Sequence, residues 1–183
     1  MLIKEKEITL KNGQKIILKS ATAADAEGIC EHRYQTSGET HFMARYPEEG
    51  RLNLEKAREG IKGLEEDEQS FLVTAYLDGK IIGDAGVTKL RELMKYRHRA
   101  YFGMSILAEY CELGLGSAMM ETAIAQAKEN GFEQIELGVF EDNPRAIHLY
   151  EKFGFEKFGR QPRAFKLKDG TYRDELIMVK FLQ

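Results

Sequence analysis

Two glycines, Gly114 and Gly116, stand directly before a segment that forms a helix from Ser117 onward. Glycine has no Cβ, so the backbone there can approach a ligand closely and can adopt a positive φ. A helix N-terminus also leaves several N–H groups without carbonyl partners, and its dipole favours an anion. The chemistry that this pattern could perform is phosphate binding. By itself, the same pattern also occurs at ordinary turns that bind nothing.

The two familiar nucleotide-binding motifs do not fit this loop. The third glycine of a dinucleotide loop would fall at Met119, and the glycines are not followed by the Gly-Lys-Ser/Thr run of a P-loop. A phosphate ligand of another kind is therefore the reading to test.

Asn143 and Tyr150 form the second group of residues with chemical potential. Asn143 is expected to cap a helix that has Pro144 at its first position. Tyr150 lies seven residues later, about two helical turns away. A phenol with a pKa of about 10 is protonated at neutral pH and can donate that proton. Spacing alone favours the simpler interpretation, in which Tyr150 packs under a sheet and Asn143 is only a cap.

The elements that must position these residues alternate between strand and helix. Residues 101–107 are rich in strand-forming side chains, and a helix from Ser117 is expected to end at Gly131. Residues 135–139 form the next predicted strand. Because a crossover helix joins the two strands, they should be parallel neighbours in one sheet.

Taken in order, these segments resemble the GNAT superfamily of acyl-coenzyme-A-dependent N-acetyltransferases. ILAEYCELGLGSAMM is similar to the strand, pyrophosphate loop and helix start of that family, and NPRAIHLYEKFGF is similar to its second cofactor segment. The resemblance covers roughly positions 70–183. It extends to the branch of ribosomal-protein alanine/serine and spermidine/spermine acetyltransferases through Gly159, Arg160, Asp169, Gly170, Tyr172, Asp174 and Met178.

The resemblance implies a fold, a cofactor and a set of site residues. The fold is a single α/β domain over residues 1–183, a mixed and mostly antiparallel sheet of six to seven strands with helices on both faces and a splayed parallel pair. The cofactor is acetyl-CoA, and Tyr150 is the general acid. The implied cofactor contacts are the main chain at Met104 and Ile106, the loop residues Cys111, Glu112, Leu113, Gly114, Leu115, Gly116 and Ser117, and the second segment at Asn143 and Ala146.

The loop departs from the family pattern at three positions. Related chains carry glutamine or arginine, then glycine, then a basic residue, where this chain has Cys111, Glu112 and Leu113. A cradle of main-chain N–H groups can survive these changes. A carboxylate at Glu112 is unfavourable near a diphosphate unless it points into solvent, where salt screens it.

The base that would deprotonate an amine is not identified by the sequence. Asp84, His98, Glu109 and Glu136 are candidates, and a chain of water molecules is an equal alternative. The irregular segment Gly38–Arg51 is either a surface loop or a lid over the acceptor. Hairpin turns are predicted at Asn12-Gly13, Asp78-Gly79 and Asp169-Gly170, and helix caps at Thr22 and Asn53.

Composition narrows the class of protein further. The chain has 183 residues and a formal net charge of −3, which gives no basic footprint for nucleic acid. Cys30 and Cys111 do not suggest a disulfide framework, and no metal-ligand spacing is present. With no apolar run long enough to span a membrane, a cytoplasmic protein is expected.

The reading that unites these features is an N-acetyltransferase that moves acetyl from acetyl-CoA to a primary amine, either a small molecule or a peptide N-terminus. Transfer is expected to be direct, in a ternary complex, with Cys111 as the one residue that could argue for an acyl-enzyme. A homodimer is one expected state. The alternative is a non-catalytic acyl-CoA-binding or regulatory module on the same fold, motivated by the Cys111-Glu112-Leu113 departure.

Overall fold

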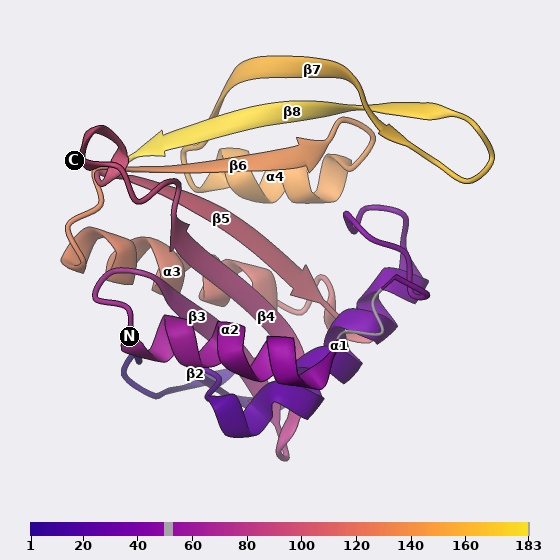
Figure 1. Ribbon diagram of the computed structural model, residues 1–183. Coiled ribbons are helices and arrows are strands. Elements are labelled where there is room, and N and C mark those ends of the chain that lie inside the picture. The colour runs from indigo at the N-terminus through magenta and orange to yellow at the C-terminus, as the bar shows by residue number, and fades with distance from the viewer. Residues whose placement is uncertain (50–52, 183) are drawn as a thin grey trace.

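The computed structural model describes residues 1–49 and 53–182. These residues form one sheet of eight strands in the order β1-β2-β3-β4-β5-β6-β8-β7, with helices on both of its faces (Figure 1). The strands are β1 (Lys6–Thr9), β2 (Lys15–Lys19), β3 (Phe71–Leu77), β4 (Lys80–Lys89), β5 (Arg99–Ile106), β6 (Gln134–Phe140), β7 (Glu156–Lys166) and β8 (Tyr172–Phe181). The longer helices are α1 (Ala26–Glu39), α2 (Leu54–Glu66), α3 (Leu115–Glu129) and α4 (Pro144–Lys152).

The predicted fold class is confirmed, with one difference in strand number. The sheet is mixed and mostly antiparallel, as expected, but it has eight strands instead of six or seven. The four-residue strand β1 pairs fully with β2 and adds one more strand at the sheet edge. Within the described residues, no helix is long and apolar enough to cross a membrane.

The local turn and cap predictions hold. Each predicted hairpin turn places a glycine at positive φ, with 87° at Gly13, 83° at Gly79 and 83° at Gly170, a conformation that glycine adopts without steric cost. The Asn53 side chain accepts a hydrogen bond from the N–H of Glu55 at the start of α2. Thr22 donates to the Asp25 carboxylate, as the predicted capping box requires.

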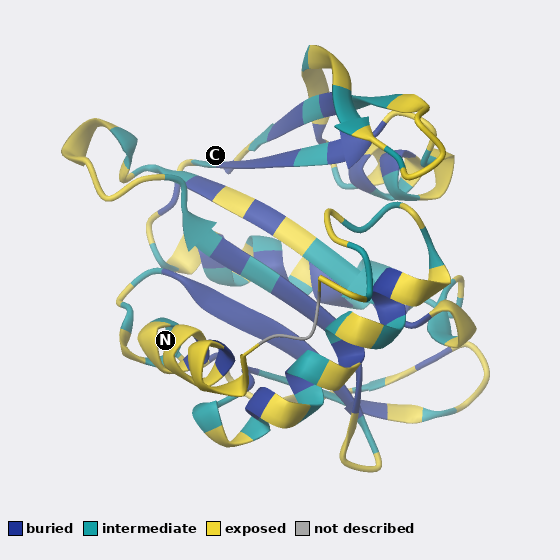
Figure 2. Ribbon diagram, turned by 45° about the vertical axis from the view of Figure 1, so that its right-hand side comes forward, coloured by how far each residue is buried: buried dark blue, intermediate teal, exposed yellow. Residues whose placement is uncertain are grey.

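The core has two parts, one on each face of the sheet. The larger cluster joins the sheet to α3 and α4, whereas the smaller cluster lies under α1 and α2. Side chains alternate between buried and exposed along β5, so this strand presents one face to the larger cluster and the other face toward solvent (Figure 2). Cys30 is a free cysteine that packs partly buried against the smaller cluster.

The parallel strands β5 and β6 are paired over only three positions. Arg99 lies opposite Gln134, Ala100 opposite Ile135 and Tyr101 opposite Glu136, and beyond these residues the two strands diverge. Figure 1 shows them close together at one end and far apart at the other. The splayed parallel pair predicted from the sequence is therefore present. Because β6 pairs with β8 along its whole length, the opening separates the sheet into two parts.

A bidentate ion pair holds the closed end of this opening. The Arg99 guanidinium donates to both carboxylate oxygens of Glu136, at 2.5 and 2.8 Å. These bonds hold the pKa of the Glu136 carboxyl below its ordinary value although burial acts in the opposite direction. Glu136 is 6% exposed, so its charge depends on Arg99 for compensation.

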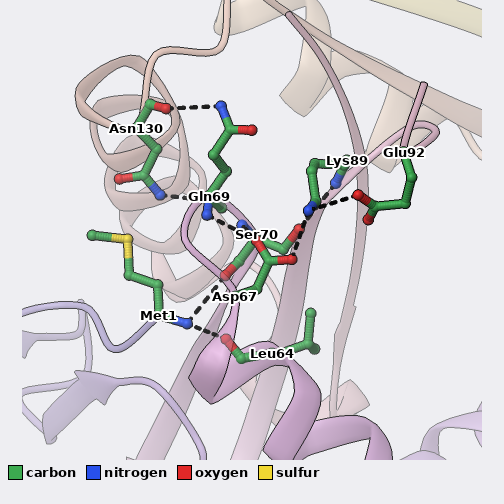
Figure 3. Close-up of polar contacts among 8 residues, drawn as sticks. All are labelled: Met1, Leu64, Asp67, Gln69, Ser70, Lys89, Glu92 and Asn130. Atoms are coloured by element: carbon green, nitrogen blue, oxygen red, sulfur yellow. Dashed lines mark hydrogen bonds and ion pairs between the residues drawn. The ribbon is translucent and has the colours of Figure 1, made fainter. Parts of the chain in front are cut away.

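A second polar cluster fixes α3 relative to the sheet (Figure 3). The side chain of Gln69 donates to the carbonyl of Asn130, and the side chain of Asn130 donates to the carbonyl of Gln69, at 3.1 and 2.7 Å. Asp67 accepts from the N–H groups of Gln69 and Ser70 and pairs with Lys89 at 2.9 Å. Burial opposes the charge on Asp67, but these donors outweigh it and lower the pKa of the carboxyl to about 2. The C-terminal end of α3 is thereby tied to the start of β3.

We predict that Arg99→Met lowers the free energy of unfolding by about 3 kcal/mol at pH 7, because it leaves the buried Glu136 charge unpaired. The loss should shrink as the pH falls below about 4, where Glu136 can protonate. Urea denaturation across pH would measure both effects. Arg58→Met is the control, since Arg58 is 51% exposed in its pair with Glu55 and should cost less than about 1 kcal/mol. Equal losses for the two variants would contradict this account.

Candidate active site

The glycine loop has the geometry of an anion site at a helix N-terminus. Gly114 is the cap residue of α3 and has a φ of 94°, a left-handed conformation that favours glycine. Its carbonyl accepts the first helical hydrogen bond, from Ala118, at 3.1 Å. The N–H groups of Leu115, Gly116 and Ser117 belong to the first turn and have no carbonyl partner within the helix. They are the donors that a diphosphate would use.

Glu112 also adopts a left-handed conformation, with a φ of 63°. The family pattern described above has glycine at this position, and a left-handed conformation is one that glycine adopts without steric cost. The Glu112 side chain is exposed to solvent, which is the condition under which a carboxylate here is tolerable. Lys11 holds the outer side of the loop, because its ammonium donates to the Glu112 carbonyl at 3.1 Å and its N–H to the Leu113 carbonyl at 3.0 Å.

Gly116 brings the loop into contact with β5 and α4. A Cβ at this position would lie 3.2 Å from Leu149, 3.4 Å from Ile106 and 3.7 Å from Met104. The structure therefore places Met104, Ile106 and Gly116 together, as the resemblance implied. Leu149 also lies at this contact, although the sequence analysis did not single it out. Its position directly before Tyr150 on the same helix could have indicated that it lies near the site.

The second predicted cofactor segment forms the start of α4. The Asn143 side chain accepts a hydrogen bond from the N–H of Ala146 at 3.2 Å, and Pro144 occupies the first helical position. The cap prediction for Asn143 is confirmed. Its side-chain oxygen is already used by this cap, so a role for Asn143 and Ala146 toward a cofactor stays a prediction.

Tyr150 lies in the wall between the two halves of the sheet. It is 7% exposed, and its ring meets the edge of Phe102 on β5 at a centroid distance of 6.3 Å. Burial, with a smaller effect of Tyr101, raises the pKa of the Tyr150 phenol to about 12. The phenol is therefore protonated at neutral pH. Packing and proton donation are compatible here, because the ring is buried on the side of the sheet that carries the glycine loop.

Cys111 lacks the properties of an acyl nucleophile. Burial raises the pKa of its thiol, and although Arg145 opposes this effect, Glu39 and Glu112 add to it. The thiol lies 3.7 Å from the carbonyl oxygen of Leu107. A nucleophilic cysteine needs its thiolate, which a lowered pKa provides. The environment of Cys111 therefore disfavours a covalent acyl-enzyme.

The four carboxylate and histidine candidates for the base are not brought together at Tyr150. Asp84 is buried and bonded to Arg33 and Thr74, at 3.0 and 3.1 Å. Glu136 is held by Arg99 at the closed end of the opening. Glu109 is exposed just before the loop, and His98 precedes β5. Two groups that the sequence did not indicate, Tyr101 and Glu175, lie on the sheet face opposite the loop.

The segment proposed as a lid extends over the end of β6 and the hairpin of β7 and β8. The Tyr46 hydroxyl accepts a hydrogen bond from the N–H of Lys168 at 2.8 Å, and the His41 side chain lies 3.0 Å from Asp142. Phe42 packs edge-on against Phe140 at 5.9 Å. Gly50 and Arg51, at the end of the predicted segment, lie outside the described residues.

The described sheet opens between two parallel strands, and one of its faces carries the glycine-capped N-terminus of α3 and the buried phenol of Tyr150. A model of the acetyltransferase (GNAT) family matches residues 29–155. The chain belongs to this family, and acetyl-CoA is its co-substrate.

Individual relatives agree with this assignment. The GNAT-family acetyltransferase from Streptococcus pneumoniae superposes with a TM-score of 0.87 at 27% identity, over 92% of this chain and 99% of that one. The L-amino acid N-acetyltransferase AaaT from Escherichia coli K12 is 31% identical over 125 residues, 67% of this chain and 70% of that protein. The structure of yncA, a putative acetyltransferase from Salmonella typhimurium with its cofactor acetyl-CoA, has a TM-score of 0.79 at 18% identity, over 92% and 94% of the two chains.

The two left-handed positions of the loop predict opposite effects on coenzyme A binding. Gly114→Val should destabilise the protein by about 1–2 kcal/mol and weaken binding at least about tenfold, because a β-branched residue is strained at this φ. Glu112→Gly relieves strain and removes a negative charge near the phosphates, so binding should stay equal or become tighter. Calorimetric titration with coenzyme A and thermal melting would measure both.

Gly63→Ala is the matched control for these loop variants. Gly63 lies in the interior of α2 with open space around its Cβ position. This change should stabilise the helix by about 0.5–1 kcal/mol and leave coenzyme A affinity unchanged. A marked loss of affinity in Glu112→Gly would show that the carboxylate takes part in binding.

Proposed function

We propose that this protein acetylates a primary amine by direct transfer from acetyl-CoA, with both substrates bound together at the opening between β5 and β6. The observation that supports this most directly is the arrangement around that opening. The anion-binding loop, the start of α4 and the buried phenol of Tyr150 belong to one side of the sheet, whereas Tyr101 reaches the other side. A donor and an acceptor can therefore enter from opposite faces and meet where the strands separate.

The cofactor side of the site is built from main-chain groups. The N–H groups of Leu115, Gly116 and Ser117 would hold the diphosphate. The missing Cβ of Gly116 lets this turn pack closely against Leu149, Ile106 and Met104. Beyond Tyr101, the strand β5 has no partner on its β6 side, so its main chain can bond an extended arm like an added strand. When bound, acetyl-CoA supplies the acetyl group as a thioester.

Tyr150 is the group that we assign to the leaving sulfur. A departing thiolate benefits from a proton, and the Tyr150 phenol holds one at neutral pH because its pKa is raised to about 12. Its place in the wall of the opening is supported by its contacts with Phe102 of β5 and Phe155. The raised pKa of Cys111 supports direct transfer over an acyl-cysteine.

The acceptor is proposed as a primary amine, either a small molecule or a peptide N-terminus. The printed name of the Escherichia coli relative points to amino acids as one class to test. We also propose a cytoplasmic location and a homodimer, the latter supported by the exposure of Phe158 on the edge strand β7. The alternative of a non-catalytic module rested on the unusual loop residues, and it is now less well supported. Glu112 adopts a left-handed conformation, and its side chain is exposed to solvent.

An acceptor screen tests the proposed activity. The full chain should release free thiol from acetyl-CoA in the presence of at least one member of a panel of spermidine, L-amino acids and alanyl or seryl peptides. A thousandfold excess of acetyl-CoA over its Kd should add about 4.1 kcal/mol of stability and raise the Tm, whereas ATP and NAD should not. A Tm shift without turnover of any amine would favour the binding module.

Tyr150→Phe should lower kcat and kcat/KM together by roughly 10²–10⁴, because a proton donor to the leaving group acts in the transition state. Binding of acetyl-CoA should change little, since loop amides supply most of it. Tyr76→Phe is the matched control, because Tyr76 on β3 is also 7% exposed but packs under α1 and α2. Its activity should equal that of the wild type. Turnover of Tyr150→Phe within threefold of the wild type would remove Tyr150 from the reaction.

A further inference from the structure

Glu175 is a carboxylate at the open end of the parallel strand pair. It lies on β8 opposite Phe140 of β6, and its side chain folds back across Gly138. The Glu175 carboxyl carbon is only 2.7 Å from the position that a Cβ would take at Gly138. The absence of a side chain at Gly138 is therefore what allows the carboxylate to lie there.

Gly138 places this carboxylate inside the opening. The last residue of β6 that pairs with β5 is Glu136, so Gly138 is two residues beyond the point of separation. Alternation along β6 puts Glu136 and Gly138 on the same face of the sheet, and Tyr101 shares that face because it lies directly opposite Glu136. Glu175 thus lies on the face opposite the glycine loop, which is the face proposed for the acceptor.

Within residues 1–49 and 53–182, no cation pairs with the Glu175 carboxylate. Among the described residues it forms no hydrogen bond or ion pair, in contrast to Asp84 and Glu136, which are each held by an arginine. Burial raises the pKa of its carboxyl. A carboxylate with a raised pKa and no cationic partner is a better proton acceptor than one that donors already stabilise.

Several charged groups of the surrounding elements pair with one another, and two cations of β7, Arg163 and Lys166, lie over the ring of Tyr172. On β6, Glu136 is paired with Arg99, and on β7, Arg160 is paired with Glu141 and Asp174. His41, from the segment over Phe140, is paired with Asp142, which also receives Arg173. In addition to burial, the charge of Glu175 helps to raise the pKa of the Tyr101 phenol on β5, and Tyr101 in turn helps to raise the pKa of the buried Tyr150 phenol. Glu175 thus has an electrostatic effect on Tyr101, and Tyr101 has one on Tyr150.

We propose that Glu175 binds the ammonium group of the acceptor and takes its proton, which makes it the general base of the proposed amine acetylation. This inference rests on that function and adds a residue to it. The proton leaves the acceptor nitrogen for the Glu175 carboxylate, and the freed lone pair forms the N–C bond to the acetyl carbon. The C–S bond breaks with its electron pair on sulfur, which receives the Tyr150 proton. The second proton of the nitrogen passes to solvent. The proton on Glu175 then returns through solvent to the Tyr150 phenolate, so that both side chains are restored and one proton is released overall.

This position also indicates the class of acceptor. Glu175 is half-buried and has no partner among the described residues, so its carboxylate gains from a cation and favours amines that arrive as ammonium ions. The half-buried ring of Phe165 stacks on the buried ring of Phe140 at 3.9 Å, so the surroundings of Glu175 are apolar on this side. A cationic primary amine fits both features.

The test uses Glu175→Gln in the full chain, with the panel amine that the wild type acetylates fastest. The change keeps the shape of the side chain and removes the charge. We expect kcat/KM at pH 7 to fall by roughly 10²–10⁴, the range of general-base contributions. The residual rate should rise about tenfold per pH unit toward the pKa of the free amine, whereas the wild-type rate should be flat there. Glu156→Gln, the same change at an exposed site on β7, should match the wild type.

A second variant moves the Glu175 side chain without changing its carboxylate, and so tests whether the location of this group matters. Gly138→Ala should push Glu175 toward solvent, lower kcat/KM by at least tenfold and return the pKa of the Glu175 carboxyl toward its ordinary value. The carboxyl pKa can be followed by ¹³C NMR in wild type and variant, with thermal melting to show that both are folded. Calorimetry should give an unchanged affinity for acetyl-CoA in Glu175→Gln, since the carboxylate is on the other face.

The outcomes separate the two levels of the proposal. A wild type that acetylates an amine, combined with Glu175→Gln within threefold of its rate and with the same pH profile, would overturn the role of Glu175 and leave the proposed function standing. A wild type that acetylates no amine of the panel would overturn both. Loss of activity with the pH profile and NMR shift described above would support Glu175 as the base.

Discussion

The separation of β5 and β6 after three paired residues is the constraint on which the rest of the structure depends. Two parallel strands that diverge leave main-chain N–H and C=O groups without ladder partners, and such groups must find other partners. The ion pair of Arg99 with Glu136 fixes where the divergence begins. The pairing of β6 with β8, and of β5 with β4, keeps the two halves of the sheet rigid on either side. An extended ligand arm can then complete the sheet that the strands leave open.

The sheet divides the chemistry between its two faces. The loop at Gly114 and the helix ends of α3 and α4 offer N–H groups and positive dipole ends, which suit an anionic donor. The opposite face carries the carboxylate of Glu175, which is unpaired among the described residues and would suit the cationic acceptor that we propose. Charges of opposite sign thus draw the two substrates to opposite sides of one opening, and Tyr101 and Tyr150 lie between them.

Local features were predictable from the sequence, and long-range proximity was not. Asn143, Pro144 and the hairpin glycines act through residues within a few positions, so their patterns predicted caps and turns correctly. The left-handed conformation of Glu112 escaped prediction, because the residue type that signals it is absent. Glu175 gave no local signal, since its place depends on the register of β8 against β6 and on the missing side chain at Gly138.

The pKa of Tyr150 places a condition on its role. A phenol at about 12 is a weak acid toward a thiolate whose ordinary pKa is roughly 8.5, so proton transfer would be uphill in water. Burial, however, raises the pKa of any acid that gains charge on losing its proton, and a sulfur held beside Tyr150 experiences the same environment. The difference between the pKa values of the phenol and the thiol in the same environment therefore decides the proton transfer. Because burial raises both values, this difference is smaller than the one between a buried phenol and a thiol in water. The same reasoning applies to the proposed role of Glu175. Burial raises the pKa of its carboxyl and so brings it closer to the pKa of the amine that it would deprotonate.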